Sequence, residues 1–455
     1  MGTILVSFLG AARRQGEAKD PSNLGYRTAC YRFPAEAHHP AVEVRTPLFG
    51  AALLRRLREL GRAPDCWLIL GSDQSMWDAL AEAVPEAERQ RIPRELLAEV
   101  GRAFRIEDAR PPEDPDALLE RWRAAVEPAI GTRCLTQRIG TGDGDKSWEA
   151  LWLALRRVCG RQRQPGTPGD ESPRIDLVLD VTNGLRHQPV VAAFMVMLLR
   201  RLYRIGRVDL CYGALELRDE RDVAPVFFLP QSTRLLEATE ALATLQYTAN
   251  FGPLADCLDL PPTASKNIDA VAFKDETGQE ARAEAEAAAR SLDEITPDAI
   301  DAELLPWLQM PLRWVAGKSL ARRMGEKARF AFQHEQYLKA VVLLYEAFAV
   351  AGVHRIPDLH DEANYKDRQD ALSRLRSDPA LLSYNEQLLL QDLAALRNAI
   401  VHGTPPKHRS RAAEALRWPQ PPANPLAVRS QPEQLTRVFQ NAYSLLQQKL
   451  NAWGL

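Results

Sequence analysis

Long apolar runs, paired cysteines and an excess of charge are all lacking in this chain of 455 residues. No stretch approaches the roughly 18 consecutive apolar residues of a membrane helix. The longest candidate, Val190–Leu199, is short and is followed by two arginines. The first ten residues lack the charged segment and the cleavage site of a signal peptide. We therefore expect a cytoplasmic protein that makes no contact with a membrane.

The six cysteines stand singly, so no C-x-x-C pair is present. Zinc fingers, iron–sulfur clusters and a disulfide framework are disfavoured by this scatter. The net charge of −2 does not indicate nucleic-acid binding, although basic residues slightly outnumber acidic ones after Leu320. We expect no metal site and no required cofactor.

Short apolar runs alternate with helical patterns in the first half of the chain. The predicted strands are Ile4–Leu9, Thr28–Phe33, Val42–Thr46, Cys66–Leu70, Cys134–Ile139, Ile175–Val181, Val208–Leu215 and Pro225–Phe228. Helices are predicted at Phe49–Leu60, from Trp77 onward, at 90–127, at Trp148–Val158 and at 188–204. This alternation predicts a Rossmann-like α/β domain with a mainly parallel sheet covered on both faces.

The second half shows no strand pattern and predicts an all-α region. The helical segments are 231–258, read as a hairpin, 278–292, polar and expected to be exposed, 299–335, 336–351, 365–377, 383–400 and 431–452. The proline-rich basic stretch 403–428 is expected to be a loop. We place domain boundaries near residues 230 and 318, which gives domains 1–230, 231–318 and 319–455.

Small and polar residues follow four of the predicted strands. They form the segments Ser7–Gly10, Gly71–Asp73, Gly140–Gly142 and Thr182–Gly184, with Arg186 two residues beyond the last. Ligands of open parallel sheets bind at the carboxyl ends of strands, and amides at the start of the next helix favour anions. Such residues also cap helices in any α/β domain, so a nucleotide site and plain capping both stay open. GxGxxG and GxxxxGK[ST] are absent, which disfavours conventional NAD sites and P-loops.

One of these segments carries a resemblance. DVTNGLRHQP, residues 180–189, resembles the D-x-T-x-G-x-R-x-x-P signature of CRISPR-associated Rossmann-fold (CARF) sensor domains. MGTILVSFLG and LGSDQSMWDAL also look like family segments, and the likeness covers about residues 1–230. The resemblance implies a cyclic oligoadenylate, tetra-adenylate or alternatively hexa-adenylate, bound across a homodimer that could assemble further. The ligand-binding residues would be Ser7, Gly10, Ser72, Asp73, Thr141, Thr182, Asn183, Gly184 and Arg186.

An arginine five residues before a histidine occurs three times in the C-terminal half. The pairs are Arg329/His334, Arg355/His360 and Arg397/His402. Spacing alone does not separate them, because so short a pattern arises readily by chance. Arg397/His402 follows an amphipathic helix, and residues five apart lie about 140° around a helix axis, so both can border one groove.

The sequence RNAIVHG around Arg397 resembles the R-x4–6-H site of HEPN ribonucleases, and QYLKAVVLLYEAFA resembles their first long helix. The 2′-hydroxyl of RNA is the nucleophile next to the scissile phosphate. His402 can exchange the proton, Arg397 can stabilise the developing charge, and Asn398 can orient His402 or the phosphate. The implied products are a 2′,3′-cyclic phosphate and a 5′-hydroxyl, formed without metal.

The combined resemblance is to CARF–HEPN ribonucleases of type III CRISPR defence. It implies a cyclic oligoadenylate-activated, metal-independent endoribonuclease that cleaves single-stranded RNA, with 231–318 as a helical connector between sensor and nuclease. Two alternatives remain open. One is a non-catalytic nucleotide-sensing regulator whose helical domain binds a partner, and the other is a small-molecule α/β enzyme with a helical cap.

Overall fold

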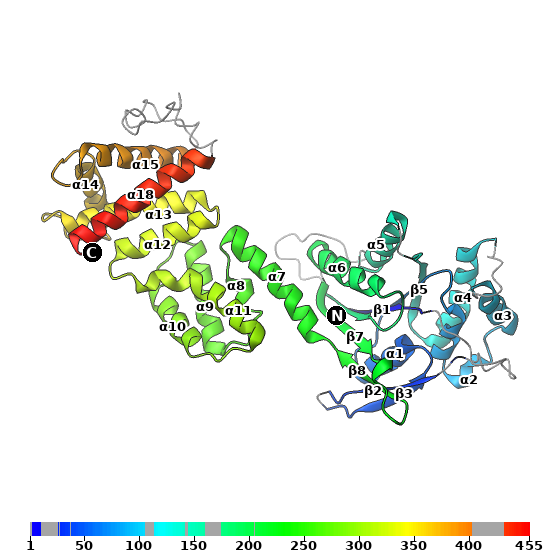
Figure 1. The fold of residues 1–455 in the computed structure, drawn as a ribbon. Helices are drawn as coiled ribbons and strands as arrows, with labels where there is room; N and C mark the ends of the chain where they lie inside the picture. The colour runs from blue at the N-terminus through cyan, green and yellow to red at the C-terminus, as the bar shows by residue number, and fades with distance from the viewer. Residues whose placement is uncertain are drawn as a thin grey trace. The chain divides into compact units, whose positions relative to one another are not determined.

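A computed structural model of the chain describes residues 2–10, 26, 28–36, 38–104, 113–141, 144–159, 174–203, 205–402 and 432–455. The chain forms two compact units, residues 1–236 and 237–455 (Figure 1). The first is an α/β unit and the second is helical, as the sequence predicts.

The α/β unit is built on one eight-stranded sheet. Its strands are β1 (Gly2–Phe8), β2 (Ala29–Phe33), β3 (Val42–Thr46), β4 (Cys66–Gly71), β5 (Arg133–Arg138), β6 (Ile175–Asp180), β7 (Ile205–Gly213) and β8 (Val223–Phe228). Their order across the sheet is β3-β2-β8-β7-β6-β1-β4-β5. Five of the seven strand contacts are parallel, and only β2/β3 and β7/β8 are antiparallel. The predicted mainly parallel sheet is confirmed.

Helices cover both faces of this sheet. They are α1 (Phe49–Glu59), α2 (Glu86–Arg89), α3 (Arg94–Ala103), α4 (Pro115–Ile130), α5 (Asp145–Cys159) and α6 (His187–Leu202), with short 3-10 helices η1 (Trp77–Ala83) and η2 (Leu215–Leu217). The helix predicted from Trp77 onward is present as a 3-10 helix.

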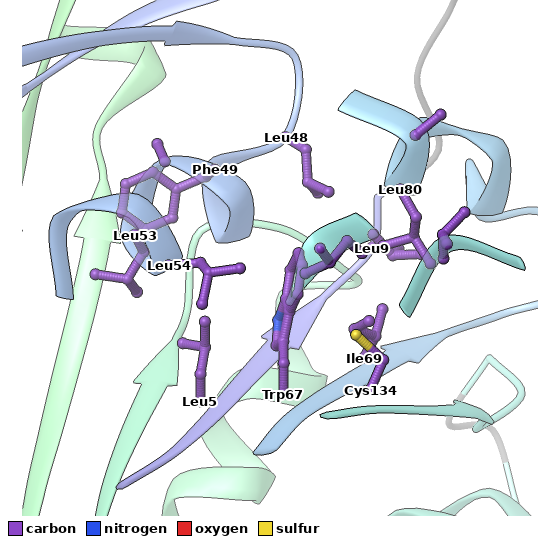
Figure 2. Packing of buried hydrophobic residues seen from close by; sticks show 14 of the residues in the cluster. Leu5, Leu9, Leu48, Phe49, Leu53, Leu54, Trp67, Ile69, Leu80 and Cys134 are labelled. Atoms are coloured by element: carbon purple, nitrogen blue, oxygen red, sulfur yellow. The ribbon is translucent and has the colours of Figure 1, made fainter. Parts of the chain in front are cut away.

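The central strands are apolar on both sides, so each face has its own core. Ile4 and Val6 of β1 pack with α5 and α6 on one face. Leu5 and Leu9 pack with Trp67 and helices α1, α3 and α4 on the other face (Figure 2). Successive side chains of a strand point to opposite faces, which explains why a continuous apolar run supplies both cores.

Helix α1 lies unusually close to the sheet because of Gly50. A Cβ atom at this position would lie 2.6 Å from Ser7 Oγ and 2.9 Å from the Trp67 ring. The contact is therefore possible only for glycine in this arrangement. Gly213 has the same role at β7, where a Cβ would lie 2.7 Å from Phe49.

The second unit contains only helices in its described part. They are α7 (Pro230–Thr248), α8 (Gly252–Ala255), α9 (Pro262–Glu276), α10 (Arg282–Asp293), α11 (Ala299–Gln309), η3 (Met310–Ala316), α12 (Leu320–Gln333), α13 (Tyr337–Arg355), α14 (Tyr365–Leu375), α15 (Tyr384–His402) and α18 (Pro432–Trp453). The predicted segment 299–335 is in fact α11, η3 and α12, with prolines at 306 and 311 near the break.

Two large apolar clusters, one within 238–330 and one within 321–455, and a small one within 353–381 fill the described part of this unit. Asp275 of α9 joins the two groups of helices, because it pairs with Lys327 of α12 at 3.0 Å and with Lys339 of α13 at 2.5 Å. The two ammonium groups lower the pKa of Asp275 against the opposing effect of its burial.

Segment 278–292 is not the exposed helix that its polar composition predicts. Ala285, Ala288 and Leu292 of α10 are fully buried in the cluster within 238–330. Alanines spaced by three and four residues form a buried face although each one is only weakly apolar.

Helix α13 is apolar along most of its 19 residues, although the charged residues Lys339 and Glu346 interrupt the run. By length and composition it is the one described helix that could cross a membrane. However, 61% of its most apolar 18-residue window is buried within the protein, as in a core helix.

Candidate functional site

The carboxyl ends of β1 and β6 lie side by side at the point where the strand order reverses. After β1 the chain forms β2 and β3 at one edge of the sheet, then β4 and β5 on one side of β1, and then β6 and β7 on the other side. Parallel sheets bind ligands at such a switch point. Here Gly10 follows β1 and Thr182–Gly184 follow β6, so the topology brings two of the predicted segments together.

The loop after β6 packs directly on the end of β1. A Cβ at Gly10 would lie 3.6 Å from Asn183 Oδ1, and one at Gly184 would lie 3.0 Å from Phe8 Cβ. Gly184 has φ +90°, a conformation that favours glycine. The Thr182 hydroxyl accepts a hydrogen bond from the Gly213 amide at 2.8 Å, which fixes the loop to β7.

The segment after β5 is held to the start of α6. Gln188 Nε2 donates to Gly140 O at 3.0 Å, and His187 Nε2 lies 3.0 Å from Thr141 O. Gln188 Oε1 accepts from the Leu185 amide at 3.2 Å. These contacts of Gln188 and His187, which are not among the nine predicted ligand residues, place Thr141 beside the loop after β6.

The segment after β4 is joined to the end of β1 as well. Ser75 Oγ donates to Leu9 O at 2.9 Å and accepts from the Ser72 amide at 2.8 Å. The Met76 amide donates to Gly10 O at 3.1 Å. The described residues of all four predicted strand-end segments are thus parts of one connected edge of the sheet, while Gly142 lies outside the described residues.

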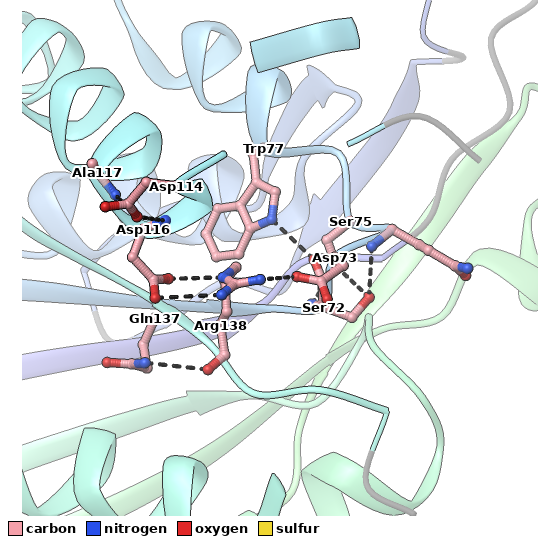
Figure 3. Close-up of polar contacts among 10 residues, drawn as sticks. Ser72, Asp73, Ser75, Trp77, Asp114, Asp116, Ala117, Gln137 and Arg138 are labelled. Carbon is pink, nitrogen blue, oxygen red and sulfur yellow. Dashed lines mark hydrogen bonds and ion pairs between the residues drawn. The ribbon is translucent and has the colours of Figure 1, made fainter. Parts of the chain in front are cut away.

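An ion-pair cluster at this edge engages one predicted ligand residue. Arg138, the last residue of β5, pairs with Asp73 and with Asp116 of α4, at 2.7 Å from Nε to Asp116 Oδ1 (Figure 3). The side chain of Asp73 is exposed, but it already forms an ion pair with Arg138. Sequence reasoning missed Arg138, because its partners lie 65 and 22 residues away along the chain.

The nine predicted ligand residues differ in accessibility. Asp73, Thr141 and Arg186 are exposed, and Gly10, Ser72, Thr182, Asn183 and Gly184 are half-buried. Ser7 is fully buried, and its hydroxyl accepts a hydrogen bond from Trp67 Nε1 at 3.0 Å under α1. Ser7 therefore lies below the surface that the other eight residues share.

Asn183 has an amide nitrogen with no partner among the described residues. Nδ2 of Asn183 is buried and makes no hydrogen bond. A buried donor without an acceptor is unfavourable unless a ligand or water supplies one. The Asn183 side chain lies beside Gly10 through Oδ1, Cβ and Cγ, and the exposed Arg186 follows three residues later. The edge can therefore offer an amide donor and a cation to a phosphate-bearing ligand.

The second predicted site lies near the end of α15. Arg397 is half-buried, and its Nη1 donates to Asn398 Oδ1 at 3.0 Å. The guanidinium lies over the Tyr345 ring of α13, 5.8 Å from its centroid. Arg397 Nε is buried and has no hydrogen-bond partner among the residues described. His402 is the last residue of α15, and its side chain lies outside the described residues, as does the predicted loop 403–428.

Tyr345, which the sequence did not single out, lies under Arg397 and is influenced by the charge of Arg376. Burial raises the pKa of its phenol, while the charges of Arg376 and Arg397 lower it. Arg376 follows α14, so three helices contribute to the surroundings of Arg397. An arginine held over a buried aromatic ring, with a second arginine whose charge acts on the same ring, suits a bound phosphate.

The other two arginine–histidine pairs have different surroundings. Arg329 pairs with Glu326 at 2.6 Å, and His334 is buried with Nδ1 2.9 Å from Gln246 O. Arg355 ends α13, and His360 lies beyond it in an exposed loop. Within the described residues no group of three or more His, Cys, Asp or Glu side chains could hold a metal ion.

No family model and no curated protein matches the chain. Among solved structures, the chain is similar to Enterococcus italicus Csm6 bound to cyclic hexa-2′-fluoro-hexa-dAMP, over 100% of this chain and 99% of that one. The sequence identity is 10% and the TM-score is 0.36, a value too low to assign a shared fold.

Proposed function

We propose that this protein is an endoribonuclease of type III CRISPR defence that a cyclic oligoadenylate activates. The sensor would be the strand-end edge of the α/β unit, and the nuclease site would be Arg397, Asn398 and His402 of the helical unit. One observation carries the proposal. A buried side-chain donor without a partner occurs at each predicted site, Asn183 Nδ2 at one and Arg397 Nε at the other. Both donors suit phosphate oxygens.

The proposed reaction needs only groups that the chain supplies. The 2′-hydroxyl of the RNA loses its proton to a general base and attacks the adjacent phosphorus, and the bond to the 5′-oxygen breaks. This leaves a 2′,3′-cyclic phosphate and, after proton transfer, a 5′-hydroxyl. His402 would move the protons, and Arg397 would stabilise the charge on the phosphorane oxygens. Asn398, which accepts from Arg397 Nη1, would hold the guanidinium in place.

Cleavage of a fluorophore-labelled single-stranded RNA tests this function. The full chain is incubated in EDTA with cyclic tetra-adenylate, with cyclic hexa-adenylate or with neither. We expect cleavage only with one of the two rings, and end groups that carry a cyclic phosphate. Ring binding without cleavage would favour the non-catalytic regulator, and loss of cleavage in EDTA would contradict the metal-independent reaction.

The proposed active form is a homodimer, and an apolar face of α6 supports it. Val190, Phe194, Leu198 and Leu202 are spaced by four residues, and Phe194 is 62% exposed. Residues four apart lie on one side of a helix, so these side chains form a continuous stripe. Contiguous exposed apolar surface of this kind marks interfaces. Because α6 begins directly after the Thr182–Gly184 loop, a second copy on this stripe would bring two such loops near each other.

Phe194→Glu should convert the dimer to a monomer at micromolar concentration, since a carboxylate in an apolar interface is strongly unfavourable. Sedimentation velocity measures the change. Phe273→Glu is the matched control, because Phe273 is 64% exposed on α9 of the other unit. A dimer that survives Phe194→Glu, or that is lost equally in Phe273→Glu, would contradict an interface on α6.

A further inference from the structure

A series of buried polar groups crosses four strands beneath the strand-end loops. Trp67 Nε1 of β4 donates to Ser7 Oγ of β1 at 3.0 Å, and Ser7 is the register partner of Asp180 on β6. The Thr182 amide donates to Asp180 Oδ1 at 2.8 Å, and the Gly213 amide at the end of β7 donates to the Thr182 hydroxyl. Asp180 is therefore the group that connects the interior of the sheet to the loop after β6.

Asp180 is an unusual carboxyl group. Its side chain is completely buried, and Oδ2 forms no hydrogen bond with any residue that the structure describes. Burial raises the pKa of Asp180 to about 7, although hydrogen bonds from Thr182 and Ser7 oppose the shift. Near neutral pH the group can therefore be either charged or neutral.

The titratable groups that face Asp180 do not compensate its charge. They are Tyr31 of β2 and Cys211 of β7, and burial raises the pKa of both, so they are uncharged at neutral pH. Arg218 acts on Tyr31, whose pKa it lowers, but no described cation forms an ion pair with Asp180. When Asp180 is ionised, no described cation therefore neutralises its charge through an ion pair.

The loop that Asp180 holds is the part of the edge best suited to an anion. It carries the unpartnered amide of Asn183 and leads into the amino end of α6, with Arg186 exposed nearby. An ionised carboxylate two residues before Thr182 would repel a phosphate bound there, whereas the neutral acid would not.

We propose that Asp180 is a positioning residue for the Thr182–Gly184 loop, and that the loop takes its ligand-binding placement when Asp180 holds a proton. The ligand in question is the phosphate-bearing ring of the proposed function, on which this inference rests. By reciprocity, a bound anion favours the protonated form of Asp180. Ligand binding above pH 7 should therefore be accompanied by uptake of at most one proton per subunit from the solution.

The size of the effect follows from this linkage. If the ligand raises the pKa of Asp180 by one unit, the Kd should weaken by up to about tenfold between pH 6 and pH 8.5. Asp180→Asn keeps the shape and an acceptor for the Thr182 amide but cannot ionise. This variant should lose the dependence and bind more tightly than the wild type at pH 8.5.

Calorimetric titration of the full chain with cyclic tetra- and hexa-adenylate tests the linkage. Measurements at pH 6 to 8.5 in two buffers with different ionisation enthalpies give the Kd and the protons taken up. Asp176→Asn is the matched control, since Asp176 lies at the other end of β6 and accepts from the Arg207 amide. His187→Gln removes the imidazole at the start of α6 and so separates any contribution of this side chain from that of Asp180. Ring binding with no proton uptake would overturn the inference and leave the proposed function intact.

A measurement without ligand tests the positioning role of Asp180 even if neither ring binds. Hydrogen–deuterium exchange of the 180–187 peptide is compared between the wild type and Asp180→Asn at pH 6 and pH 8. We expect similar exchange at pH 6 and faster exchange of the wild type at pH 8, because the buried charge favours opening of the loop. Equal exchange at both pH values would overturn the positioning role of Asp180, and absence of ring binding alone would count only against the proposed ligand.

Discussion

Arg397→Ala should lower kcat for RNA cleavage by at least about 10²- to 10³-fold, the usual effect of removing a group that stabilises charge in the transition state. The residue is well placed for this role. Its guanidinium is held by Asn398 on one side and by the Tyr345 ring on another, and its Nε remains available. Arg397→Lys should restore little, because an ammonium group cannot form two parallel hydrogen bonds to a phosphate.

The same assay contains its own control. Arg329→Ala removes an arginine with the same spacing to a histidine, but one that pairs with Glu326. We expect its kcat to stay close to that of the wild type, while His402→Ala behaves like Arg397→Ala. Both inactive variants should still bind the activating ring with unchanged Kd. Equal losses in the Arg329 and Arg397 variants would argue against a catalytic role for Arg397.

The stability of the α/β unit should fall as the pH rises toward 7, and Asp180 should be the cause. Below the ordinary carboxyl pKa, about 3.8, the group is neutral in both states and contributes no pH dependence. Between this value and about 7, the folded protein keeps a proton that the unfolded chain has released, so stability decreases with pH. The shift of the Asp180 pKa by roughly three units corresponds to about 4 kcal/mol of unfolding free energy. The protein has this contribution below the ordinary carboxyl pKa and has lost all of it once the pH exceeds 7.

Urea unfolding at pH 5, 6, 7 and 8, followed by hydrogen exchange of β6 peptides, measures this dependence. Asp180→Asn should remove most of the dependence of the unfolding free energy on pH. The Nδ2 atom of the new asparagine finds no hydrogen-bond acceptor, which can lower stability by the same amount at every pH. Asp176→Asn should keep the wild-type slope. If the slope persists in Asp180→Asn, another group is responsible for it.

The sequence predicted the sheet well because its central strands are short apolar runs between helical patterns. The orientation of Ser7 was not predictable from the same pattern. With apolar residues on both faces of β1, alternation shows which side chains share a face but not which face points to α1. Ser7 therefore looked like a ligand residue at a strand end, while its hydroxyl in fact lies inside, bonded to Trp67.

The polar contacts of the candidate sites depend on residues far apart in the chain. Arg138 reaches Asp73 and Asp116, and Tyr345 reaches Arg397, with no local pattern that announces either contact. Asn398, by contrast, is adjacent to Arg397 in sequence and is one of the predicted catalytic residues. The sequence did not predict its hydrogen-bond partner, since Asn398 Oδ1 accepts from Arg397 Nη1.

The close approach of α1 to the sheet also limits how this sequence can change over evolution. Positions 7, 50 and 67 share one small volume, because any side chain at Gly50 would overlap Ser7 Oγ and the Trp67 ring. Position 50 can therefore gain a side chain only if position 7 or 67 loses atoms, or if α1 moves away from the polar groups beneath it. We therefore expect a side chain at position 50 to occur only together with a smaller residue at position 7 or 67.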